Sequence, residues 1–165
     1  MSAKKFFTYR VTPTVYVGDA DTGDVVFNLT KVLTGVRGGE SVKLKSITGI
    51  DTDKTDKDLG FIFFQKNTTA NIGTLGATSN ISDANFLANV PIGCALFRWG
   101  TAGVLANVNI STYPSASVAG GAELILTSSP DAAEGEIYVA AITTQDDCNY
   151  AAADDLELIF HFETM

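Results

Sequence analysis

Apolar and polar residues alternate along most of this chain, most clearly in the segment from residue 156 to residue 163. The residues of one parity there are all apolar, namely Leu156, Leu158, Phe160 and Phe162. A period of two is the side-chain repeat of a β-strand with one face turned towards a core. This segment therefore predicts a half-buried strand.

Similar alternation, or a short apolar run, marks nine segments in which we expect strands: residues 5–17, 24–33, 41–50, 60–66, 92–99, 103–110, 122–127, 135–143 and 156–163. Clusters of Gly, Asp, Asn and Pro separate them, as turns require. One short segment, residues 82–89, is a helical candidate. Many short strands with almost no helix predict an all-β protein, an antiparallel β-sandwich or closed barrel of eight to ten strands.

Three segments make finer predictions. Within residues 41–50 the inward parity shifts between Leu44 and Ile47, which indicates a β-bulge near Lys45 and Ser46. Alternation in the fourth segment turns Phe61 and Phe63 away from Ile62 and Phe64. Alternation in the sixth predicts one apolar face made of Val104, Ala106, Val108 and Ile110.

A length of 165 residues fits one domain, which we divide into an N-terminal arm or edge strand (residues 1–18) and a single β-sandwich domain (residues 19–165). The arm gathers aromatic residues and cations in an otherwise acidic chain. Such a segment can cover the edge of its own sheet or pair with a neighbouring chain, and the sequence favours neither. We expect Phe6, Phe7, Tyr9 and Arg10 to form an interface.

Composition excludes several classes of function. The formal net charge is −8, with 11 Lys and Arg scattered among 19 Asp and Glu, which disfavours binding to nucleic acid. One His and two Cys cannot make a zinc site of four cysteines or of two cysteines and two histidines. No apolar run approaches the roughly 20 residues that span a bilayer, and the start does not resemble a signal peptide. We expect a reducing cytosol, with Cys94 and Cys148 as thiols; a disulfide between them is the alternative.

The segment Asp51–Asp58 is the densest cluster of carboxylates and the clearest candidate for a metal site. Calcium takes oxygen ligands from loops of this kind. The EF-hand pattern fails, however, because Asp56 occupies the place of the turn Gly and Ile62 that of the closing Glu. A solvated connection between strands is therefore favoured, and we predict no metal ion and no cofactor.

His161 could serve as a general base, because Glu157 and Glu163 share its strand face. A hydrolase would also need a nucleophile, and no Gly-x-Ser-x-Gly or similar signature is present. We therefore predict no catalytic residue, and expect His161 to form an exposed or interfacial ion pair.

Trp99, the single Trp, ends an apolar strand. With Tyr113 and Tyr150 it could form an aromatic platform that stacks on sugars, which would make the protein a carbohydrate-binding module or a receptor-binding adhesin. One aromatic residue at a strand end is more typical of a core or an interface, so we place Trp99 with the interface residues.

Four pieces of the chain resemble virion proteins of tailed bacteriophages. They are, in order, a strand, acidic hinge and Phe-rich strand over Ser41–Lys66, the turn Ile81–Leu87, the strand Glu136–Thr143 and the final strand Leu156–Phe162. The most specific features are the Ile-Ser-Asp-Ala turn and the Tyr-Val-Ala-Ala strand. Together the pieces span about residues 40–163, and none of them carries chemistry.

The resemblance implies a jelly-roll capsid decoration (cement) protein. Such a protein would bind the outer surface of a capsid, with the major capsid protein and further copies of itself, in a homotrimer, as its partners. It would be located in the virion, on the exterior of a capsid assembled in the host cytoplasm. Neither a membrane nor nucleic acid is an expected partner.

Overall fold

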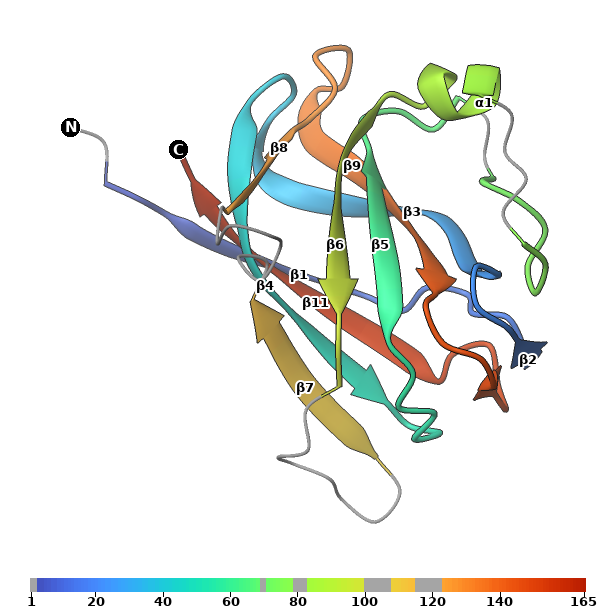
Figure 1. The fold of residues 1–165 in the computed structure, drawn as a ribbon. Helices are drawn as coiled ribbons and strands as arrows, with labels where there is room; N and C mark the ends of the chain where they lie inside the picture. Colours follow the sequence, from blue (N-terminus) through green and yellow to red (C-terminus); the bar gives the residue numbers. More distant parts are fainter. Residues whose placement is uncertain (1–2, 69–70, 79–82, 100–107, 115–122) are drawn as a thin grey trace.

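The computed structural model of this protein describes residues 3–68, 71–78, 83–99, 108–114 and 123–165, which fold into two facing antiparallel sheets (Figure 1). The elements are β1 (Phe6–Val11), β2 (Gly18–Ala20), β3 (Val25–Arg37), β4 (Ser41–Asp51), β5 (Leu59–Phe64), α1 (Asp83–Ala88), β6 (Pro91–Phe97), β7 (Asn109–Pro114), β8 (Leu124–Thr127), β9 (Glu134–Thr143), β10 (Cys148–Tyr150) and β11 (Leu156–Thr164). The predicted short helix is confirmed as α1.

The strand order is that of a jelly roll. One sheet runs β1-β11-β4-β7, with β8 beside β7 on the same edge of β4, and the other runs β3-β9-β5-β6. The chain therefore passes repeatedly from one sheet to the other, as in the paired Greek keys of jelly-roll domains. Strands β2 and β10 form a separate small ribbon. The predicted fold class, an all-β jelly-roll-like antiparallel sandwich, is confirmed.

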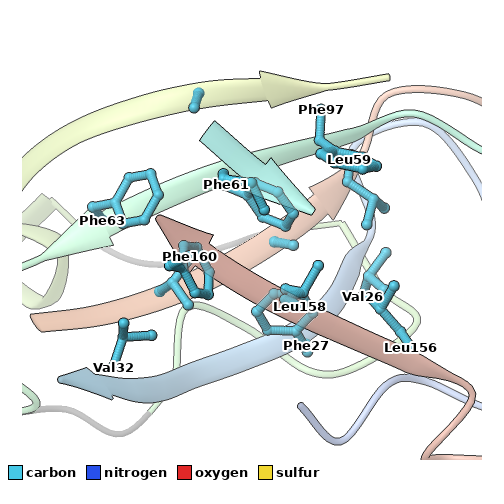
Figure 2. Close-up of a cluster of buried hydrophobic side chains, with 14 of the residues drawn as sticks. Val26, Phe27, Val32, Leu59, Phe61, Phe63, Phe97, Leu156, Leu158 and Phe160 are labelled. Carbon is cyan, nitrogen blue, oxygen red and sulfur yellow. The ribbon is translucent and has the colours of Figure 1, made fainter. Parts of the chain in front are cut away.

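Aromatic rings fill the space between the two sheets (Figure 2). Phe61 lies at the centre, with its ring centroid 6.1 Å from that of Phe27, 5.9 Å from Phe97 and 6.5 Å from Phe160. All four are fully buried. The alternation in β5 and β11 places Phe61 and Phe160 inward, so this part of the core follows directly from the sequence pattern.

A second, smaller core lies on the outer face of the β3-β9-β5-β6 sheet. It contains the buried residues Val25, Phe64, Ile72 and Ala140. Phe86 of α1 packs edge-on against Phe64, with 5.3 Å between the ring centroids. Phe64 thus points away from the main core, as predicted, yet is buried because α1 covers it.

The predicted bulge in β4 is confirmed at Lys45. Ser46 pairs with His161 and Leu44 pairs with Phe162, so Lys45 is the extra residue on its strand. The bulge also divides the far edge of β4, where β7 pairs with residues 46–51 and β8 with residues 41–44.

The predicted apolar inward face of residues 103–110 is wrong at the end of this segment that the structure describes. Residues 103–107 lie outside the described part of the chain, and the described strand β7 begins at Asn109. Asn109 is buried whereas Ile110 is 42% exposed, because Asn109 pairs with Asp51 and Ile110 with Ile50 on the outer face. The buried position is therefore polar.

Candidate interaction surface

Strand β1 forms the edge of its sheet by pairing antiparallel with β11, from Phe6 opposite Glu163 to Val11 opposite Leu158. The pairing continues to Lys5, whose carbonyl oxygen accepts from the Thr164 amide at 2.9 Å. The predicted interface residues of β1 alternate between the two faces of the sheet. Phe7 and Tyr9 pack against the core, whereas Phe6, which is 74% exposed, and Arg10 lie on the outer face.

Phe7 is held in place by close approach to β3. A Cβ atom built on Gly35 would lie 2.4 Å from the Phe7 ring, and Gly35 has a φ of 77°, which favours glycine. A glycine at this position thus provides both the space and the backbone conformation that let β1 lie against β3.

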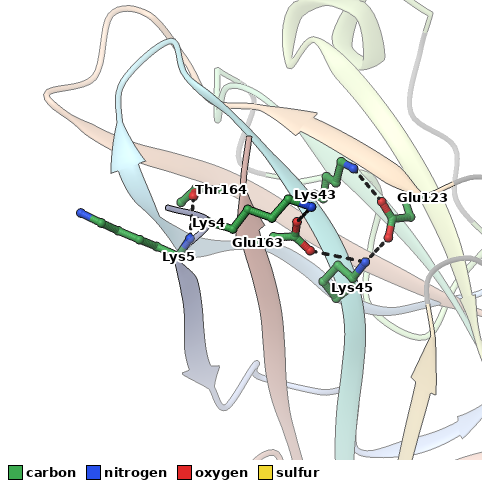
Figure 3. A network of polar contacts seen from close by, with 7 residues as sticks. All are labelled: Lys4, Lys5, Lys43, Lys45, Glu123, Glu163 and Thr164. Carbon is green, nitrogen blue, oxygen red and sulfur yellow. Dashed lines mark hydrogen bonds and ion pairs between the residues drawn. The ribbon is translucent and has the colours of Figure 1, made fainter. Parts of the chain in front are cut away.

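A network of charged side chains crosses the outer face beside β1 (Figure 3). Lys4 pairs with Glu163 at 2.8 Å, and Lys43 pairs with Glu123 at 3.0 Å. The bulge residue Lys45 connects the two pairs by contacting both Glu123 and Glu163. We call these five residues the charge network; it ties the start of β1 to β11, β4 and the start of β8.

The charge network shifts the pKa values of its carboxylates. Hydrogen bonds from Lys45 and then Lys43 lower the pKa of Glu123 to about 2, and Lys4 lowers the pKa of Glu163. A lowered pKa means that folding favours the ionised carboxylate. The stabilisation is therefore present above the ordinary Glu pKa and is lost as the pH falls from there towards 2.

We expect Lys45→Met to move the pKa of Glu123 back towards the ordinary value of about 4.3, because its strongest hydrogen bond is removed. Carboxyl carbon NMR titration of the two proteins measures this. Lys31→Met is the matched control, since Lys31 pairs with Glu136 on the other sheet. An unchanged Glu123 titration in Lys45→Met would show that the charge network does not hold this carboxylate.

Within the described residues His161 forms no ion pair, and an ion pair at an interface stays a prediction. Its neighbours Glu157 and Glu163 pair instead with Arg10, at 2.5 Å, and with Lys4 and Lys45. His161 Nε2 lies 3.0 Å from the Thr48 hydroxyl oxygen. The register explains this, because Arg10 on β1 and Lys4 just before β1 reach the carboxylates of the adjacent strand β11.

Trp99 is not on β1 but follows β6, and it is partly buried against the main core. Its indole N–H donates to the Lys57 carbonyl oxygen at 3.0 Å, and its ring packs edge-on against Phe97, with 5.0 Å between the centroids. Tyr150 is 1% exposed, so it cannot stack on a sugar, and the side chain of Tyr113 lies outside the described part. The three predicted residues therefore do not form a sugar-binding platform.

Three acidic loops interlock at the end of the sandwich that holds Trp99. We call residues 18–24, 51–58 and 144–155 the acidic end. Hydrogen bonds join the loops in pairs: Thr22 N to Asp146 Oδ1 at 2.9 Å, Thr52 N to Asp155 O at 2.9 Å, Thr144 N to Asp58 O at 3.1 Å and Ala151 N to Asp53 Oδ2 at 3.0 Å. The ribbon β2-β10 closes this end.

Asp51 organises the central loop of the acidic end from a fully buried position. Its two carboxylate oxygens accept from the backbone amides of Asp53 at 2.9 Å and Asp56 at 3.2 Å. Burial raises the pKa of Asp51, and these amides act in the opposite direction. The prediction that residues 51–58 form a solvated connection is thus wrong at the first residue, because Asp51 faces inward at the end of β4.

The part of the chain that the structure describes holds no cluster of metal-ligating side chains and no disulfide. No three His, Cys, Asp or Glu side chains there gather into a metal site. Cys94 is exposed and Cys148 is buried, both as free thiols, and burial raises the pKa of Cys148 to about 11. None of the described helices has the length and apolar character needed to cross a membrane.

Comparison with known proteins adds solved viral structures of similar fold. No protein family model matches the chain, and no curated protein matches it. A structure of tomato aspermy virus matches with a TM-score of 0.40 and 12% identity, over 99% of this chain and 78% of that one. The T13 viral particle of infectious bursal disease virus matches with a TM-score of 0.39 and 8% identity, over 98% and 31%.

A particle of Israeli acute paralysis virus matches with a TM-score of 0.28 and 8% identity, over 98% of this chain and 70% of that one. All three matched structures come from viral particles. Because their TM-scores lie below 0.5, these likenesses carry no argument about function. The assignment of the jelly roll rests on the strand order of this chain.

Proposed function

We propose that this protein is a structural component of a virion that decorates or cements the outer surface of a capsid as a homotrimer, in contact with the major capsid protein. The observation that carries the proposal is the jelly-roll strand order, an architecture used by viral capsid domains and by lectins. The resemblance of residues 40–163 to tailed-phage virion proteins favours the first of these uses.

Attachment would be passive. We propose a binding protein and not an enzyme; in the described residues no three His, Cys, Asp or Glu side chains gather into a metal site that could support catalysis. A trimer would present the same patch three times, and weak individual contacts would gain affinity from their effective concentration. The outer face of β1, with exposed Phe6 and Arg10 beside the charge network, is the proposed contact surface.

A test uses particles that lack this protein, to which purified protein is added. We expect Phe6→Asp to weaken binding to such particles by about tenfold or more, because a charge replaces an exposed aromatic side chain at the contact. Leu87→Asp is the matched control. Leu87 is similarly exposed, at 65%, but it belongs to α1, which covers the other sheet. Equal binding of both variants would reject β1 as the contact surface.

Stoichiometry and mass test the remaining parts of the proposal. In purified particles a decoration protein should approach the copy number of the major capsid protein, whereas an adhesin at a tail tip would be present in few copies. Light scattering should give three times the 17.4 kDa mass of the chain. A strictly monomeric protein at the concentrations of assembly would contradict the trimer.

A further inference from the structure

The acidic end carries more than the whole net charge of the protein. Its three segments hold eleven of the 19 carboxylates but only two of the 11 Lys and Arg, which leaves this end at −9 and the rest of the chain at +1. In the part that the structure describes, Asp51, Asp53 and Asp56 have no ion pair with any cation. Such a concentration of carboxylates favours a bound cation, although acidic residues alone do not define a site.

Asn109 supplies the observation that does point to a ligand. It faces inward opposite Asp51 and is 1% exposed. Its side-chain amide lies against the central acidic loop, because Nδ2 donates to the Asp56 carboxylate. Its Oδ1 has no hydrogen-bond donor among the described residues. Buried polar atoms are nearly always paired, so this unpaired carbonyl oxygen needs a hydrogen-bond donor or a cation as its partner.

Tyr150 gives a second, independent observation of the same kind. Its side chain is 1% exposed, and its hydroxyl has no hydrogen-bond partner among the described residues. The carboxylates of Asp51, Asp53 and Asp155 all lie near enough to act on it electrostatically. Two unpaired buried oxygens thus border the same loop.

We propose that Asp51, Asp56 and the Oδ1 atom of Asn109 bind a divalent cation of the calcium class. The backbone amides of Asp53 and Asp56 hydrogen-bond to the Asp51 carboxylate, those of Lys54 and Thr55 also act on it, and together they hold it in place at the base of the loop. Asp56 is exposed, so the proposed ligand set reaches the protein surface at this residue. Calcium accepts mixed carboxylate, amide and water oxygens in irregular geometry, whereas magnesium requires a near-ideal octahedron. The proposal is independent of the proposed virion role.

Terbium luminescence tests this site, because Tb³⁺ replaces Ca²⁺ and is sensitised by a nearby indole. Trp99 is the only Trp, and it donates to Lys57 within the same loop. We expect saturable luminescence on excitation of Trp99, and displacement of Tb³⁺ by Ca²⁺ with a dissociation constant between roughly 10⁻⁵ and 10⁻³ M. The absence of saturable, calcium-competed luminescence would overturn the proposal and leave water as the partner of Asn109.

Variants separate a defined site from a diffuse acidic surface. We expect Asp56→Asn and Asn109→Ala to weaken Tb³⁺ binding by about tenfold or more, since each removes a ligand. Asp154→Asn is the matched control: Asp154 is an exposed carboxylate of the same end, and its loss should change affinity less than about threefold. Equal losses in all three variants would overturn the proposal.

Folding of each variant is checked by Trp99 fluorescence without metal. Asn109 is buried, so its replacement by Ala can disturb the end of β4. Asp56 is exposed, and its replacement by Asn keeps the side chain's shape. The Asp56→Asn result therefore decides the matter if Asn109→Ala does not fold.

Discussion

Replacing Phe61 by Ala should lower the free energy of unfolding by about 3–5 kcal/mol, which is much of the stability of a domain of this size. Phe61 is fully buried, and its ring contacts rings contributed by β3, β6 and β11. Its removal leaves a cavity at the point where the two sheets meet. Urea denaturation followed by circular dichroism measures the loss.

Two controls accompany this variant. Phe61→Leu keeps most of the volume and should cost less than half as much, whereas Phe6→Ala removes a ring that is 74% exposed and should change stability by less than about 0.5 kcal/mol. A loss below about 1 kcal/mol in Phe61→Ala would mean that the sheets do not pack as described.

Replacing Gly35 by Ala should lower the free energy of unfolding by about 2–5 kcal/mol, the second large effect. A φ of 77° is strained for any residue with a Cβ, which accounts for about 1–2 kcal/mol. The new methyl group would also lie within 2.8 Å of three atoms of the Phe7 ring, so β1 must shift, and overpacking of this kind costs about 1–3 kcal/mol.

Hydrogen exchange distinguishes this local effect from general destabilisation. The amides of β1 and its partner strand β11 should lose protection before those of β5 and β9. Gly60→Ala is the matched control, because a Cβ there has only ordinary contacts at 3.4 Å or more and the effect should stay below about 1 kcal/mol. Protection lost equally over both sheets would contradict a local displacement of β1.

The sequence pattern predicts those strands in which one face is fully buried and made of apolar residues only. In β11 all four inward residues are apolar and fully or almost fully buried, and the period is unmistakable. The bulge at Lys45 was predictable because a shifted parity has few other physical causes. In β7 the same reasoning fails, since an inward Asn109 bonded to Asp56 looks, in the sequence alone, like an outward polar residue.

The candidate sites were less predictable than the fold. Glu123, Lys45, Glu163 and Lys4 lie far apart in the sequence, and only the pairing of β1 with β11, of β11 with β4 and of β4 with β8 brings them together. Strands β2 and β10 have three residues each, too few to show a period, so the closure of the acidic end could not be foreseen. Asn109 carried no signal, because asparagine is ordinary in turns and loops.

The uneven distribution of charge gives the molecule a large electric dipole along the sandwich. An approaching cationic surface would therefore rotate the protein before contact, bringing loops 18–24, 51–58 and 144–155 foremost and the chain termini last. At physiological ionic strength such steering fades beyond roughly 8 Å, so salt concentration would control how fast the protein docks in one orientation.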